Sequence, residues 1–222
     1  MKYIVFLSLF FITCPGQPQE FGTIPQTSSI WIDGNHTEWG NVPTLFLSSS
    51  DSTITEGKGT FEKSSLELDI QVAWNEEDLY VAAFWEDDVL DVIDIPLDSV
   101  LWTGHPDGLR RDKMYYYDNL AIRLRVPNYF GYWLTPGNME KGGLQHAELI
   151  NPSSAIKQID EHTFFIESKV SWRELGIRPS VGDTVNLQII APDSDTPSSS
   201  LLEKNPSTKY LLWQEDVVLG KQ

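Results

Sequence analysis

Residues 66–85, LELDIQVAWNEEDLYVAAFW, decide the fold class of this 222-residue chain. Apolar and polar side chains alternate over its first nine residues, which is typical of a β-strand with one buried face. The buried face is expected to carry Leu66, Leu68, Ile70, Val72 and Trp74, and the solvent face Glu67, Asp69, Gln71 and Ala73. Residues 75–78 are a polar turn and residues 79–85 return as a second strand, so the stretch predicts a β-hairpin.

Other short strands are expected on both sides of this hairpin. Apolar alternation, together with β-branched and aromatic residues, marks them at residues 29–32, 45–47, 119–126, 155–159, 163–170, 185–190 and 210–219. Residues 86–118 and 127–148 are predicted to be long irregular connections, where binding residues are often found. Because no long amphipathic helix is evident, the pattern predicts an all-β domain, a β-sandwich of mostly antiparallel strands with jelly-roll or immunoglobulin-like layering.

The composition excludes several classes of partner. A formal net charge of -16 repels phosphate backbones, so we expect no nucleic-acid partner. The single cysteine cannot form an internal disulfide, and no Cys/His spacing indicates zinc. Eight Trp and eight Tyr suit strands, and they also suit flat surfaces on which a ligand can stack.

The N-terminus predicts export. Lys2 precedes an apolar run over residues 3–12, which is too short to span a bilayer and is typical of a secretory signal. The run ends at Cys14, an arrangement that resembles a bacterial lipoprotein signal in which the cysteine carries the lipid. We therefore predict a signal over residues 1–14, a lipid anchor to a membrane at Cys14, a flexible tether over residues 15–28 and a domain over residues 29–222, in the periplasm or on the cell surface. The alternative is an ordinary signal peptide with an incidental cysteine.

A series of short motifs, taken in order, resembles the family 9 carbohydrate-binding modules. The motifs are IWIDG at residues 30–34 with Glu38-Trp39, VAWNEEDLYV at 72–81, YDNL at 117–120, the stretch 164–176 followed by Gly182-Asp183, and residues 186–195. The resemblance extends from residue 29 to about residue 219. It implies a β-sandwich that binds carbohydrate, is not itself an enzyme, and accompanies enzymes of polysaccharide breakdown.

The resemblance also implies where a sugar binds. The best-known members of the family clamp a terminal sugar between two aromatic rings and hold calcium ions in loops. Tyr115 stands at the position of the first ring, but Ala121 stands where the family has a sugar-binding glutamate. Trp213 is the one tryptophan near the position of the second ring, and it falls in the last predicted strand. The family's terminal-sugar site is therefore incomplete in this sequence.

The chemistry of sugar recognition leads to a candidate binding face. A sugar ring needs an aromatic plane, and its hydroxyl groups need charged or amide partners. The long connections supply Trp102, Tyr115, Tyr116, Tyr129, Tyr132 and Trp133, with Arg110, Arg111, Asp112 and Asp118 beside them. We predict that an oligo- or polysaccharide stacks on Trp102, Tyr115 and Trp133 and that its hydroxyl groups are oriented by Arg111 and Asp118. The alternative is that these rings cover the end of the core, where Trp31, Trp39, Trp74 and Trp172 are expected to lie.

Acidic residues gather in two connections, Glu86, Asp87, Asp88, Asp91, Asp94 and Asp98 in one and Asp193 with Asp195 in the other. No EF-hand spacing is present, so we expect solvated acidic loops, with calcium binding as the alternative.

Two other functions stay open beside carbohydrate binding. Haem-binding domains of similar fold exist in the wider superfamily, and Met114, Met139, His105 and His146 could serve as axial ligands. A structural or partner-binding surface lipoprotein is the third reading. Catalysis is not expected, because no nucleophile, metalloprotease or phosphate-binding motif occurs in the sequence.

Overall fold

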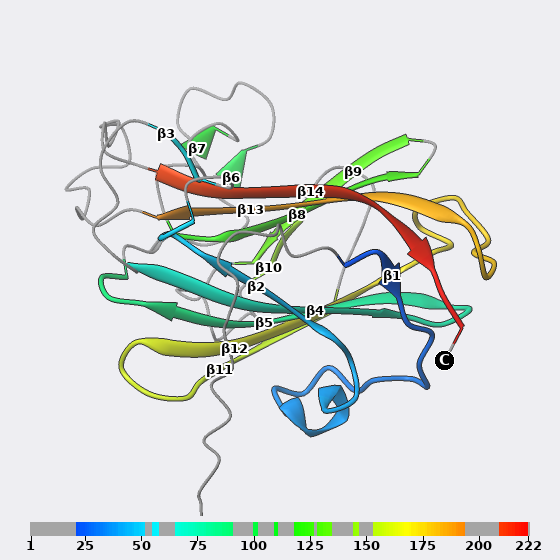
Figure 1. Cartoon of the computed structure of the whole chain (residues 1–222), viewed down its shortest axis with the longest axis horizontal. Helices are drawn as coiled ribbons and strands as arrows, with labels where there is room; N and C mark the ends of the chain where they lie inside the picture. The colour runs from blue at the N-terminus through cyan, green and yellow to red at the C-terminus, as the bar shows by residue number, and fades with distance from the viewer. Residues whose placement is uncertain are drawn as a thin grey trace, which may run out of the picture.

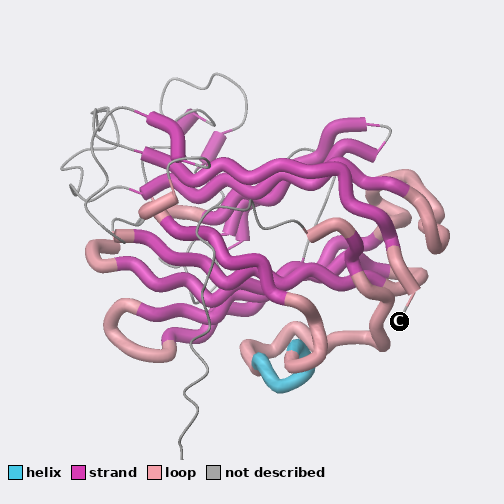
Figure 2. Tube along the Cα trace, viewed as in Figure 1, coloured by secondary structure: helices cyan, strands magenta, loops and turns pink. Residues whose placement is uncertain are grey.

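Two facing β-sheets, one of seven strands and one of five, form the domain, and a pair of short strands forms a small sheet of its own (Figure 1). The computed structural model describes residues 21–51, 55–57, 65–90, 100–101, 109–110, 118–126, 128–134, 144–146, 153–193 and 209–221. Within these residues the only helix is the short 3-10 helix η1 (His36–Trp39), and strands dominate (Figure 2). The all-β sandwich predicted from the sequence is confirmed.

The five-stranded sheet contains the hairpin that the sequence predicts. Its order is β11 (Ser153–Gln158), β12 (Thr163–Ser171), β5 (Asp78–Asp87), β4 (Leu66–Trp74) and β2 (Thr44–Ser48), with antiparallel neighbours throughout. The turn between β4 and β5 is closed by Asn75, whose Oδ1 accepts hydrogen bonds from the backbone N–H groups of Glu77 (2.8 Å) and Asp78 (2.7 Å). An asparagine side chain that mimics a backbone turn in this way fixes the register of the hairpin.

The seven-stranded sheet is the second layer. Its order is β1 (Thr23–Ile24), β14 (Lys209–Leu219), β13 (Thr184–Asp193), β8 (Leu120–Val126), β9 (Asn128–Leu134) and β10 (Leu144–His146), with β3 (Thr55–Gly57) also on β14. The separate pair is β6 (Val100–Leu101) with β7 (Leu109–Arg110). The expectation that residues 127–148 form an irregular connection is wrong, because β9 and β10 extend the sheet there. The aromatic residues of β9 favour a strand, which explains the difference.

The core lies between the two sheets and follows the predicted alternation. The side chains of Leu66, Leu68, Ile70, Val72 and Trp74 are all buried there, as expected. Trp39, Trp74 and Trp172 are buried as well. Ala73 is an exception to the predicted pattern, since it lies on the opposite face of β4 and is nevertheless buried.

A covering segment over residues 30–42 explains the burial of Ala73. Ile30, Trp39 and Val42 from this segment pack on the outer face of the five-stranded sheet, where they form a second small core with Ala73, Tyr80, Ala82 and Phe165. Residues 29–32 are not the strand that the sequence predicts, and Trp31 is 76% exposed instead of lying in the core. Because Ile30 and Ile32 face the sheet, the residue between them faces solvent.

Glu167 holds the covering segment in place. Its Oε1 accepts hydrogen bonds from the backbone N–H groups of Asp33 (2.6 Å) and Gly34 (2.5 Å), and its Oε2 accepts one from the indole N–H of Trp39 (3.0 Å). Gly34 has a φ of +83° and turns the chain beside Lys157, at a position where a side chain would be strained. These contacts give a physical reason for the IDG and EW motifs.

The folded domain begins earlier than the sequence predicts. Residues 21–28 were expected to belong to a flexible tether, but β1 pairs in parallel with the end of β14. The indole N–H of Trp74 donates to the carbonyl oxygens of Ile24 (3.1 Å) and Gly220 (3.0 Å), which ties β1 to the residue that follows β14. Cys14 and the predicted signal lie outside the described residues. Over the described part of the chain, no helix has the length and apolar character needed to cross a membrane.

Candidate functional site

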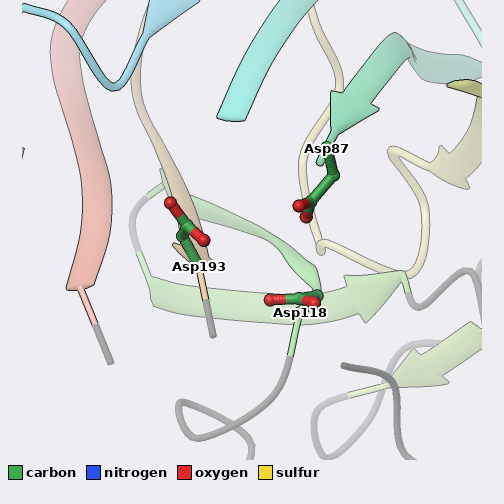
Figure 3. A group of neighbouring side chains, drawn as sticks. All are labelled: Asp87, Asp118 and Asp193. Carbon is green, nitrogen blue, oxygen red and sulfur yellow. The ribbon is translucent and has the colours of Figure 1, made fainter. Parts of the chain in front are cut away.

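Three aspartates meet at one end of the sandwich (Figure 3). Asp87 is the last residue of β5, Asp193 is the last residue of β13, and Asp118 lies two residues before β8. One carboxylate oxygen from each lies within 4.8 Å of those of the other two, and all three residues are buried. This acidic cluster therefore joins the five-stranded sheet to the seven-stranded sheet.

Neutral groups donate hydrogen bonds to Asp87 and Asp193. The indole N–H of Trp85 donates to Oδ2 of Asp87 (3.1 Å), and the backbone N–H of Val89 donates to Oδ1 (3.1 Å). The hydroxyl of Ser65 donates to Oδ2 of Asp193 (2.7 Å). These neutral donors orient the carboxylates and do not cancel their charge.

Burial and mutual repulsion make a proton or a cation favourable at the acidic cluster. Burial first, and then the neighbouring Asp193 carboxylate, raise the pKa of Asp87 to about 8. Like charges that are buried together cannot all ionise without compensation. A bound cation would lower that cost by attracting all three carboxylates.

The residues fit a calcium ion. Calcium prefers oxygen ligands at about 2.3–2.6 Å, so two ligands on opposite sides of the ion lie roughly 5 Å apart. The spread of the three oxygens, within 4.8 Å, matches that size, and carboxylates are the ligand type that calcium prefers. Asp87, Asp118 and Asp193 would supply three ligands from both sheets.

The sequence placed two of these residues differently. Asp87 and Asp193 were expected to lie in solvated acidic loops, but each is only 1% exposed. The neighbours of Asp87 along the chain, Glu86 and Asp88, are exposed as expected, although Glu86 belongs to β5 and not to a loop. A signal for burial was present, because Asp87 continues the inward alternation of β5 and Asp193 continues that of β13.

The predicted sugar-binding residues are only partly within the described structure. Trp102, Arg111 and Tyr115 lie outside the described residues. Trp133 lies in β9, where its backbone is in register with Ala121 of β8 and Gln145 of β10. Asp118, predicted to orient hydroxyl groups, is fully buried and belongs to the acidic cluster.

Tyr132 was predicted to be one of the aromatic residues of a binding loop, and this prediction is wrong. It is fully buried between the sheets, where its hydroxyl group lies 3.1 Å from the Ser168 Oγ. The absence of solvent raises the pKa of this phenol above its ordinary value. Tyr132 therefore belongs to the core and links the two layers.

The position of the family's sugar-binding glutamate is apolar here. Ala121 is fully buried and lies opposite Ile190 of β13, which is itself buried. Trp213, the remaining candidate for a second stacking ring, is 5% exposed and packs edge-on against Phe21 at a centroid distance of 5.6 Å. Neither Ala121 nor Trp213 can contact a sugar in the manner of a chain-end clamp.

Comparison with solved structures identifies modules with the same fold. A family 9 carbohydrate-binding module from Caldicellulosiruptor kristjanssonii in complex with cellotriose has a TM-score of 0.60 and 15% identity, over 90% of this chain and 93% of that chain. A family 9 module from the same organism, in complex with glucose, has a TM-score of 0.59 and 15% identity, over 90% of this chain and 94% of that chain. A protein from Bacteroides uniformis ATCC 8492 that is proposed to bind carbohydrate has a TM-score of 0.53 and 7% identity, over 90% of this chain and 97% of that chain.

The chain therefore has the fold of the family 9 carbohydrate-binding modules. The sequence itself matches no protein-family model. No curated protein is significantly similar to it.

Proposed function

We propose that this protein is a non-catalytic carbohydrate-binding module. The observation that carries the proposal is the fold, which is shared over 90% of the chain with modules in complex with cellotriose and glucose. The order of the IDG, EW and LYV motifs supports it independently. The residues proposed for sugar stacking are Trp102, Tyr115 and Trp133, with Arg111 for the hydroxyl groups.

Asp118 has a different place in this proposal. Because its carboxylate faces Asp87 and Asp193, we assign it to the acidic cluster, where these three residues would hold a calcium ion. A bound ion supplies charge neutralisation and a cross-link between the sheets. Its proposed role is structural, since the cluster lies inside the sandwich and is closed to a sugar ring.

Export and lipid anchoring complete the proposal. Cys14 would carry the lipid, and β1 (Thr23–Ile24) already belongs to the sheet. The chain between them would be at most about eight residues, or roughly 30 Å when fully extended. The domain would be held close to the membrane surface, in the periplasm or outside the cell, and would present glycans to the enzymes of polysaccharide breakdown.

Binding to sugars is tested directly on the purified protein. A glycan array finds the class of ligand, and isothermal titration calorimetry with glucose, cellotriose and neutral polysaccharides measures affinity. We expect binding to at least one neutral oligo- or polysaccharide. If no glycan binds, the proposal is wrong and a structural or partner-binding role replaces it; a Soret absorption band in the purified protein would instead favour the haem-binding reading.

A further inference from the structure

The outer face of the seven-stranded sheet carries a row of hydrogen-bonded polar side chains across three strands. We call it the amide row, and its members are Arg123 of β8, Asn186 and Gln188 of β13, and Gln214 and Asp216 of β14. The register places Gln188 between Arg123 and Gln214, and it places Asn186 opposite Asp216. The residues that alternate with them on β13, Val185, Leu187 and Ile189, fill the core, so the amide row faces away from it.

Each member of the amide row is oriented by the next. Nη1 of Arg123 donates to Oε1 of Gln188 (3.0 Å), and Nε2 of Gln188 donates to Oε1 of Gln214 (3.0 Å). Nε2 of Gln214 donates to Oδ1 of Asn186 (3.2 Å), and Nδ2 of Asn186 donates to Oδ1 of Asp216 (2.8 Å). The row thus runs from a guanidinium to a carboxylate, and every amide between them has a defined direction.

This arrangement leaves hydrogen-bonding capacity toward solvent. An amide has two N–H donors and two acceptor lone pairs, and each amide here uses one donor and one acceptor within the row. Gln214 and Asp216 are exposed, while Gln188 and Asn186 are half-buried. Because neighbouring side chains already hold the amides, a ligand would lose little of its binding energy to ordering them.

The chemistry of the amide row suits neutral sugars. Hydroxyl groups both donate and accept, as oriented amides do. One cation and one anion terminate the row, so the row itself carries no net charge, whereas the whole chain carries -16 and would repel acidic glycans. Three strands spaced about 4.8 Å apart make the row roughly 10 Å long, which is longer than one sugar ring.

The apolar residues beside the amide row argue against recognition of a chain end there. Ala121 lies two residues before Arg123 on β8, Ile190 lies two residues after Gln188 on β13, and both are buried. A chain-end site needs polar groups around the terminal hydroxyls, whereas the row adjoins apolar residues there and, at roughly 10 Å, is longer than one sugar ring.

We propose that the amide row binds an interior stretch of a neutral polysaccharide chain, with Asn186, Gln188 and Gln214 bonding its hydroxyl groups. Arg123 and Asp216 act as positioning residues that orient the amides. The inference rests on the proposed carbohydrate-binding function and goes further, because it adds hydrogen-bonding residues to those proposed for stacking and names the part of the polysaccharide chain that is recognised.

Calorimetry with a neutral oligosaccharide of six units, selected by the glycan array, and with its monosaccharide tests the amide row. The variants are Gln214→Ala and Gln188→Ala, and the matched control is Gln158→Ala on β11, an exposed glutamine of the other sheet. We expect each row variant to weaken oligosaccharide binding about fivefold, the effect of one hydrogen bond. We expect little change for the monosaccharide and none with the control.

The outcomes separate the two levels of the proposal. If the parent binds an oligosaccharide and both row variants bind it within twofold of the parent, with unchanged melting temperatures, the amide row is not the site although the protein is still a sugar binder. If the variants lose monosaccharide and oligosaccharide binding equally, recognition of a chain interior is wrong. If the parent binds no glycan, the proposed function and this inference fall together.

Discussion

Replacing Glu167 with glutamine tests whether one buried carboxylate holds the covering segment on the sheet. In the parent, Glu167 accepts hydrogen bonds from the N–H groups of Asp33, Gly34 and the Trp39 indole. Glutamine keeps one oxygen for the two backbone donors, but its NH₂ group then faces the indole N–H, so one hydrogen bond is lost and two donors oppose each other. Burial raises the pKa of this carboxylate, because desolvation outweighs the hydrogen bonds that favour its charged form.

The expected cost of Glu167→Gln is therefore about 2 kcal/mol, below the full value of the hydrogen bonds to a charged group. For a domain of this size that loss corresponds to a fall of about 4–8 °C in Tm. Urea denaturation followed by circular dichroism measures it. The matched control is Glu38→Gln, because Glu38 is exposed and accepts a single hydrogen bond from the Trp31 backbone N–H at 3.2 Å; we expect less than about 0.5 kcal/mol there.

A double-mutant cycle with Trp39→Phe then isolates the indole contact. Since the glutamine variant has already lost this hydrogen bond, Trp39→Phe should cost less in its background than in the parent. Additive effects of the two changes would refute the assigned contact. A Glu167→Gln variant as stable as the control would refute the anchoring role altogether.

Three further predictions concern the metal, the anchor and the tryptophans. Calcium at about 100 times its dissociation constant should stabilise the protein by about 2.7 kcal/mol, with a smaller effect of magnesium, which requires octahedral geometry and keeps its waters. Thermal melts in calcium and in chelator measure this gain, which Asp118→Asn should abolish and the exposed control Asp88→Asn should keep; equal melts in calcium and chelator would contradict the assignment. Cys14→Ala should move the protein from the membrane to the soluble fraction in cell fractionation, and a variant that is still membrane-bound and normally processed would rule out lipidation there. Trp31→Ala should change stability by less than about 0.5 kcal/mol and Trp39→Ala should cost about 3–5 kcal/mol, so similar urea midpoints for the two variants would contradict the observed burial.

The sequence predicted the hairpin and its buried face because both follow from local alternation. The same rule, applied strictly, would have placed Trp31 in solvent, since Ile30 and Ile32 on either side of it face the sheet. It would also have placed Asp87 inside, two residues beyond the inward-facing Trp85. The prediction placed Trp31 and Asp87 by the chemical type of their side chains, whereas the alternation of inward and outward positions along the chain was the better guide.

Other features depend on contacts that no local pattern contains. Glu167 is 133 residues from Gly34, and the three aspartates come from β5, from β13 and from the residues just before β8. Their approach follows from the strand order, in which β13 lies beside β8 and β5 belongs to the facing layer. Alternation shows which way a side chain points, but the sheet order decides which side chains it meets.

The acidic cluster and the amide row are connected through the same two strands. Asp118, just before β8, lies five residues before Arg123. Asp193, at the end of β13, lies five residues after Gln188. The aspartates continue the inward-facing alternation of β8 and β13, whereas Arg123 and Gln188 face outward. Each of these two chain segments therefore carries a residue of the acidic cluster on its inner side and a residue of the amide row on its outer side. About 17 Å of strand separates the two positions. An ion that held the ends of β8 and β13 together would keep these strands in register, and the spacing of the amides across the row depends on that register.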